Sequence, residues 1–277
     1  KGNGLKRGRT PRSMDEVVAS APGKVVLFGE HAVVYGHPAI SASIAQRTTV
    51  TLRPVEGSGI NIGRVQVNPA RHPHLASLMG RLWDASTAPG LDLSVDSDVP
   101  RGAGLGSSAA FAVASAMALR AARGRWVDPV TGAWHEGYAS DGSESELFNG
   151  AVRTDQRTEQ SVKVYGQAAV SAEEASLLGH VGEALSQEGR ASPMDTMTSA
   201  YGGLVMLFDR MEDEATWVMK RTMPMGDEQR TWDLHHLGDL RLEDGLSLVV
   251  GHTGINAPTT NMVAGVASRR ASDPGID

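Results

Sequence analysis

The sequence predicts an α+β fold, because stretches that favour strands and stretches that favour helices follow one another without an internal repeat. Residues 17–55 contain apolar stretches rich in Val, Ile and Thr that Gly and Pro separate, a pattern typical of a β meander. Residues 107–123 are rich in alanine, which has the highest helix propensity. A further segment has large apolar side chains at helical spacing, namely Leu75, Leu78, Met79 and Leu82.

The remaining elements follow from the same patterns. Strands are expected at residues 17–20, 24–28, 39–44, 48–55, 91–97, 202–208, 215–219 and 246–251. Helices are expected at residues 69–86, 107–123, 172–187 and 258–270. Two of these helices carry a start signal. Glu173 and Glu174 lie where the helix dipole favours negative charge, and Pro258 lies in a first turn, where proline is tolerated.

The bulk composition narrows the class of protein. A chain of 277 residues with 40% hydrophobic residues can bury one large core or two moderate ones. Its net charge of −6 argues against a general nucleic-acid binder, which carries a basic excess. The absence of cysteine excludes disulfides and cysteine-bound metals, and no apolar run approaches the ~20 residues that a membrane span needs. We therefore expect neither a nucleic acid nor a membrane as partner.

Two segments lack the pattern of a packed core. Residues 1–16 begin with a polar, basic stretch and are expected to form a disordered tail, with a docking arm as the alternative. Residues 126–169 contain few large aliphatic side chains and are rich in Gly, Ser, Asp, Glu and Thr. A loop of that length is uncommon inside a compact domain. We therefore expect an irregular, exposed insertion there.

A glycine-rich loop between a predicted strand and the alanine-rich helix is the first candidate site. Its glycines at alternate positions, Gly102, Gly104 and Gly106, let the backbone approach a ligand closely. The helix that follows offers free N–H groups and the positive end of its dipole, so the loop is suited to phosphate. The hydroxyls of Ser107 and Ser108 can cap the helix or ligate magnesium. The simpler alternative is a glycine-rich turn with a serine cap.

A second candidate site surrounds an apolar strand near the amino end. Lys24 follows a Pro-Gly pair at the start of that strand, and Glu30 and His31 follow a glycine at its far end. A lysine can neutralise the charge of a phosphoryl group in transfer, and Glu and His can hold hydroxyl or carboxylate groups of a substrate. The simpler alternative is that Lys24 is a solvated lysine and that Glu30 and His31 are ordinary turn residues.

With both motifs in view, the chain resembles the mevalonate kinases, which belong to the superfamily of galactokinase, homoserine, mevalonate and phosphomevalonate kinases. The segments that carry the resemblance are residues 29–36, 100–110, 191–203 and 253–266. In the first of them, Ala32 and Val33 stand where galactokinases typically have Thr and Asp. The resemblance covers about residues 18–125 and 171–270.

The resemblance implies ATP- and Mg²⁺-dependent phosphorylation of the primary hydroxyl of mevalonate, a cytoplasmic reaction of isoprenoid synthesis, and it allows a homodimer. It implies catalytic roles for Lys24 and Asp195. It implies substrate contacts for Glu30, His31 and Thr259. The residues that it assigns to ATP are Ser97, Gly102, Ala103, Gly104, Leu105, Gly106, Ser107 and Ser108, and the metal ligands that it assigns are Ser108 and Glu183.

Some assignments stay open at this point. Glu183 follows His180 at the family's spacing of three residues, whereas counting back from Asp195 leads to Ala184. The substrate could also be that of another kinase or a decarboxylase of the same pathway. A remnant of the family that binds nucleotide without turnover, or binds nothing, is the alternative from a different class.

The family has a two-domain α+β fold. We expect a nucleotide-binding domain at residues 17–222, which includes the insertion, and an incomplete second domain at residues 223–277. The family's last glycine-rich motif is missing, so weak nucleotide affinity and low turnover are expected. His235 and His236 are expected to form a solvated pair, because adjacent histidines do not converge on one metal.

Overall fold

A computed structural model describes residues 16–30, 32–83, 88–123, 125–127, 134–136, 163–165, 170–186, 191–225, 228–239 and 248–251, with single residues 265, 268, 269, 272 and 273. The strands are β1 (Val17–Phe28), β2 (Ala39–Pro54), β3 (Gly59–Ile62), β4 (Val65–Gln66), β5 (Gly90–Ser97), β6 (Arg125–Val127), β7 (Trp134–Glu136), β8 (Lys163–Tyr165), β9 (Leu204–Phe208), β10 (Trp217–Met225) and β11 (Glu228–Gly238). The helices are α1 (Pro73–Leu82), α2 (Ser107–Arg123), α4 (Ala172–Ser186) and α5 (Met194–Tyr201), with a 3₁₀ turn, η1 (Val33–Tyr35).

Within the described residues, nine strands form one mixed sheet and β6 and β7 form a separate hairpin. The longest path through the sheet runs β10-β11-β9-β2-β5-β3-β4, while β1 pairs with β2 and with β8. The pair of β3 and β5 is parallel, and the other pairs of this sheet are antiparallel. The α+β fold predicted from the sequence is thereby confirmed.

β2 is the strand that connects the two halves of the sheet. One of its edges pairs with β1 from Val17↔Leu52 to Phe28↔Ile40. Its other edge pairs with β9 through residues 39–42 and with β5 through residues 48–54. A long strand can pair with three partners in this way because the hydrogen-bonding groups of successive residues point alternately to its two edges.

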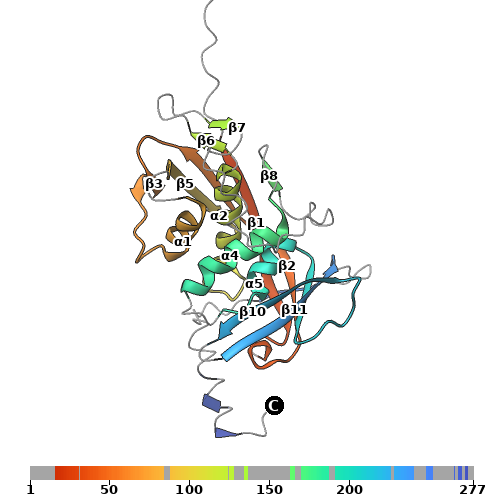
Figure 1. The fold of residues 1–277 in the computed structure, drawn as a ribbon. Coiled ribbons are helices and arrows are strands. Elements are labelled where there is room, and N and C mark those ends of the chain that lie inside the picture. Colours follow the sequence, from red (N-terminus) through yellow and green to blue (C-terminus); the bar gives the residue numbers. More distant parts are fainter. Residues whose placement is uncertain are drawn as a thin grey trace, which may run out of the picture.

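The helices cover one side of the sheet in two layers (Figure 1). α2 and α5 pack on β1 and β2, while α4 packs on α1, α2 and α5. The buried face of α2 consists mainly of alanine, so α4 can approach it closely. At Gly179 of α4, an added Cβ would lie only 2.9 Å from a side-chain methyl of Val113. Within the described residues, none of the helices has the length and apolar character to cross a bilayer.

Several element predictions were right in type and wrong in extent. The strands predicted at residues 17–20 and 24–28 form one strand, and those predicted at residues 39–44 and 48–55 also form one. The break predicted between residues 20 and 24 is instead a shift in the pairing of β1 with β2, between Pro22 and Lys24. The helix predicted at residues 107–123 has those bounds. Residues 248–251 lie outside any strand, so the strand predicted there is wrong for its described part.

Three further predictions concern the domain boundary, the insertion and the last helix. The domain boundary expected after residue 222 falls inside β10, and β11 pairs with both β10 and β9 in the main sheet. Within the insertion expected at residues 126–169, the described parts are short strands, and β8 pairs with β1. Most of the helix expected at residues 258–270 lies outside the described residues.

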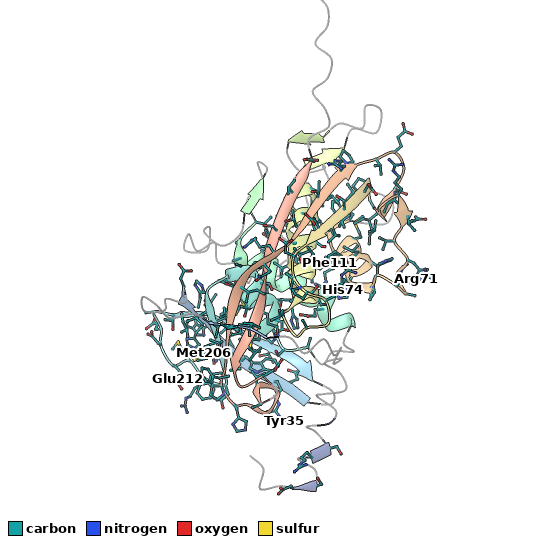
Figure 2. All side chains as sticks on the ribbon, turned by 180° about the vertical axis from the view of Figure 1, so that it is seen from behind. Tyr35, Arg71, His74, Phe111, Met206 and Glu212 are labelled. Carbon is teal, nitrogen blue, oxygen red and sulfur yellow. The ribbon has the colours of Figure 1, made fainter. Side chains whose placement is uncertain are left out.

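The prediction of a solvated histidine pair is wrong. His235 is fully buried, and His236 is half-buried with its ring near that of Tyr201. The Nε2 atom of His235 accepts a hydrogen bond from the Glu212 backbone, and its Nδ1 atom lies 3.1 Å from the Thr216 hydroxyl. Both contacts come from the turn between β9 and β10, which only the folded chain brings over β11. Glu212 is labelled in this part of the molecule in Figure 2.

Two helical glycines make a matched test of this packing. Nothing lies within 4 Å of a Cβ built on Gly80, so Gly80→Ala should raise the free energy of unfolding by about 0.5–1 kcal/mol through helix propensity. Gly179→Ala should lower it, because overpacking of about 1–3 kcal/mol exceeds the propensity gain. Urea denaturation of both variants measures the difference. Equal stabilisation by both would contradict the close approach of α2 and α4.

Candidate active site

An ion pair between Lys24 and Asp195 lies at the centre of the candidate site. The Lys24 Nζ atom is 3.1 Å from the Asp195 Oδ1 atom, although 171 positions separate the residues in sequence. The lysine side chain is 5% exposed and the aspartate side chain 31% exposed. The amine is thus shielded from water while the carboxylate stays accessible to a small molecule.

α5 places the aspartate. Asp195 lies in the first turn of this helix, where the helix dipole stabilises a carboxylate. The helix is held on the sheet by a buried hydrogen bond between the hydroxyls of Thr198 and Ser41 of β2. The Thr198 hydroxyl also donates to the Met194 carbonyl. This anchor lies one turn after Asp195 and fixes its direction relative to β1 and β2.

Glu183 of α4 adds a second carboxylate near this pair. Its side chain is buried, and burial together with the nearby negative charge of Asp195 raises the pKa of Glu183 to about 8, while the charge of Lys24 acts in the opposite direction. Both the aspartate and the lysine therefore lie within electrostatic reach of Glu183. The sequence assignment of Glu183 is consistent with this location, since the alternative, Ala184, carries no ligand atom.

His180 lies one turn before Glu183 on the same helix. It is 1% exposed, and burial with the positive charge of Arg221 lowers the pKa of His180 to about 3. The imidazole is therefore neutral at physiological pH, and it contributes no charge to the site.

The side of α4 next to α1 carries Gly182, which packs on His74. His74 in turn meets the ring of Phe111 edge to face, and both are labelled in Figure 2.

The glycine loop docks on β1 at Lys24. The backbone N–H of Lys24 donates to the Leu105 carbonyl at 2.9 Å. Gly102, Gly104 and Gly106 all have positive φ angles, which residues with a side chain rarely adopt. α2 begins directly after the loop at Ser107, so its free N–H groups face the loop. The loop thus brings an anion-binding helix start next to a buried ammonium group.

The hydroxyls assigned to nucleotide and metal lie in different surroundings. Ser108 is exposed in the first turn of α2, and Ser107 and Ala103 are half-buried. The Ser97 hydroxyl lies at the end of β5, 2.8 Å from the Thr48 hydroxyl, and accepts a hydrogen bond from the Val99 backbone. Ser97 therefore also shapes the turn that leads into the glycine loop.

The substrate residues implied by the family are described only in part. Glu30 is exposed at the end of β1, just before η1. The Val33 carbonyl of η1 accepts a hydrogen bond from the buried Trp232 indole of β11. His31 and Thr259 lie outside the described residues. Ser41 and Thr198 belong to this site but were not selected from the sequence, where an isolated Ser and Thr give no signal.

This arrangement suits phosphoryl transfer to a hydroxyl group. The loop and helix start can hold phosphate groups, the lysine can stabilise charge on the transferred group, and the accessible carboxylate can receive a proton. The described residues contain no group of three or more His, Cys, Asp or Glu side chains that could hold a metal alone.

Two family descriptions match the chain. Residues 74–133 match the family described as GHMP kinases N terminal domain, and residues 9–54 match the galactokinase galactose-binding signature. The first match contains the glycine loop and α2, and the second contains Lys24. These two stretches of the chain are therefore similar to GHMP kinases and to galactokinases.

Individual proteins are also similar to this chain. The mevalonate kinase of Methanothermobacter thermautotrophicus is 30% identical over 262 residues, which cover 93% of this chain and 64% of that protein. The mevalonate kinase of Archaeoglobus fulgidus is 41% identical over 107 residues, or 38% of each chain. A solved protein from Listeria innocua shares the fold, with a TM-score of 0.56, 18% identity, and coverage of 94% of this chain and 67% of its own. The chain spans less than two thirds of the length of the curated relatives it matches.

The raised pKa of Glu183 predicts how the stability of the fold depends on pH. The folded chain binds the Glu183 proton more tightly than the unfolded chain does. The contribution of Glu183 to the free energy of unfolding is therefore complete below pH 4.5 and is lost as pH rises through about 8. Glu183→Gln should remove this loss in metal-free buffer. Melting temperatures between pH 4.5 and 9 measure it, and the difference from the parent curve cancels the titration of other groups.

Glu56→Gln is the matched control, since Glu56 is exposed. The control should follow the parent curve throughout the range. If Glu183→Gln also follows the parent curve, Glu183 does not titrate abnormally in the folded chain.

Proposed function

We propose that the protein transfers the γ-phosphoryl group of ATP to the primary hydroxyl of mevalonate, giving 5-phosphomevalonate and ADP. The observation that carries this proposal is the Lys24–Asp195 ion pair beside the glycine loop. The relatives named mevalonate kinase support the choice of reaction and substrate. A cytoplasmic location, where ATP is available, is part of the same proposal.

In this reaction Asp195 receives the proton of the substrate hydroxyl, whose oxygen attacks the γ-phosphorus. The bond from that phosphorus to the oxygen bridging to the β-phosphate breaks, and ADP leaves. Lys24 stabilises the negative charge on the transferred group, because its buried ammonium interacts through a medium less polar than water. The N–H groups at the start of α2 hold the remaining phosphate oxygens.

A magnesium ion fits the residues assigned to it. Two carboxylates, Glu183 and Asp195, interact unfavourably and are only partly balanced by Lys24, so an additional cation would lower the free energy of the ionised site. Glu183 and the Ser108 hydroxyl would hold the ion together with ATP. The bound ion would supply charge neutralisation between the phosphate groups.

Galactose is the alternative substrate, because residues 9–54 match the galactose-binding signature. Ala32 and Val33 favour mevalonate, since galactokinases typically have Thr and Asp at these positions. A coupled ADP-release assay with mevalonate, phosphomevalonate, homoserine and galactose decides between the substrates. Turnover with mevalonate alone is the expected result. Turnover with none of them, together with Mg-ATP binding, would favour a non-catalytic role.

The first functional prediction concerns the carboxylate. Asp195→Asn keeps the size of the side chain but cannot accept the proton, so kcat should fall by about 10²–10⁴-fold. The dissociation constant for Mg-ATP should stay within a few-fold of the parent value in calorimetric titration. Asp209→Asn, at an exposed position, is the control. A kcat for Asp195→Asn close to that of the control would exclude Asp195 as the proton acceptor.

The second functional prediction separates the two roles of Ser108. If its hydroxyl holds magnesium, Ser108→Ala should raise the Mg²⁺ concentration needed for half-maximal rate several-fold with little change in melting temperature. If it only caps α2, the variant should instead lose about 1 kcal/mol of unfolding free energy at unchanged activity. Ser94→Ala on β5 is the control for an exposed serine.

A further inference from the structure

The pairing of β1 with β2 is irregular where β1 contacts the glycine loop. The pairing of β1 with β2 shifts between Pro22↔Arg47 and Lys24↔Ser43, so that Gly23 alone faces three residues of β2. At this irregularity the Lys24 N–H donates to the Leu105 carbonyl of the loop. The backbone of the reactive lysine is therefore bonded to the loop itself.

Gly23 has no room for a side chain at this junction. A Cβ built on it would lie 2.6 Å from the Leu105 oxygen, and 3.0 Å from side-chain methyls of Ile44 and Val99. The closest atom is the same carbonyl oxygen that accepts the Lys24 N–H. A side chain at position 23 would therefore push away the acceptor of that hydrogen bond, and a backbone carbonyl cannot rotate aside as a flexible side chain can.

The loop contains a second glycine that faces the same lysine. A Cβ built on Gly106 would lie 2.6 Å from Cγ and 3.3 Å from Cε of Lys24. The stem of Lys24 therefore crosses the loop at Gly106 on its way to Asp195. The two glycines therefore allow the same contact between β1 and the loop. The missing side chain of Gly23 leaves space for the loop backbone, and the missing side chain of Gly106 leaves space for the aliphatic part of Lys24.

We infer that Gly23 is a positioning residue, which holds the phosphate loop and the Lys24–Asp195 pair at a fixed separation. The inference rests on the proposed function, in which the loop carries the phosphate groups and the ion pair lies at the reacting oxygen. Phosphoryl transfer depends on alignment, and a misplacement of ~1 Å can cost about 10²-fold in rate. Displacement of Leu105 by a Cβ at position 23 is a shift of that kind.

The test compares Gly23→Ala with Gly90→Ala. A Cβ on Gly90 would lie 2.4 Å from the Val55 carbonyl oxygen, so both variants force a methyl group against a backbone carbonyl. Only Gly23 touches the loop, because Gly90 begins β5 at the opposite end from Ser97. Both variants should lose melting temperature. Gly23→Ala alone should lose about 10²-fold in kcat, with KM for mevalonate within a few-fold of the parent.

A second measurement needs no turnover. The Lys24 amine is buried, whereas Lys220 is 60% exposed and serves as an internal reference for acylation by acetic anhydride. Peptide mass spectrometry should show that the rate at Lys24, relative to Lys220, rises at least several-fold in Gly23→Ala and is unchanged in Gly90→Ala. Equal Lys24 acylation and equal kcat in the two variants would overturn the inference.

Should Gly23→Ala not fold, the same measurements apply to Gly23→Ala combined with Ile44→Val. This double variant removes the crowding methyl of Ile44 and leaves the conflict with Leu105. A parent protein without phosphate transfer to mevalonate would refute the proposed function. The acylation contrast would then still support the fixed geometry of the junction, so the two failures are distinguishable.

Discussion

The structure depends on the pairing of β2 along both of its edges. On one edge β2 holds β1, which carries Lys24. On the other edge it holds β5, which leads through Ser97 to the glycine loop, and β9, which follows the helix of Asp195. Residues from three distant parts of the chain meet because one strand provides hydrogen bonds to all three strands that lead to them.

Burial then gives the site its electrostatic character. Within the described residues, Lys24, Asp195 and Glu183 bring two carboxylates and one ammonium group into a region partly closed to water. Such a group of charges is costly in the absence of compensation, and the cost appears as the raised pKa of Glu183. A bound cation and the phosphate groups of a nucleotide are ligands that would relieve it. The same low-polarity surroundings strengthen the action of the lysine on a transferred phosphoryl group.

Close contact between backbones is the other requirement of the site. Gly23, Gly106 and Gly179 each lie where an added Cβ would come within 3.0 Å of a neighbouring atom. These contacts bring the loop onto β1 and α4 onto α2. The site residues are thus held by packed helices and strands and not by the loop alone. Phosphoryl transfer between two bound molecules needs such fixed positions.

The sequence by itself determined the class of fold, the bounds of α2, the glycine loop and the family resemblance, because these depend on local periodicity, glycine spacing and contiguous motifs. Only the tertiary structure decided that Asp195 meets Lys24, that Thr198 is anchored to Ser41, and that β11 pairs with β9. It also reversed the interpretation of His235, which the β9–β10 turn covers. Such contacts join residues far apart in the chain, and their energies come from burial and pairing that no local pattern of residues encodes.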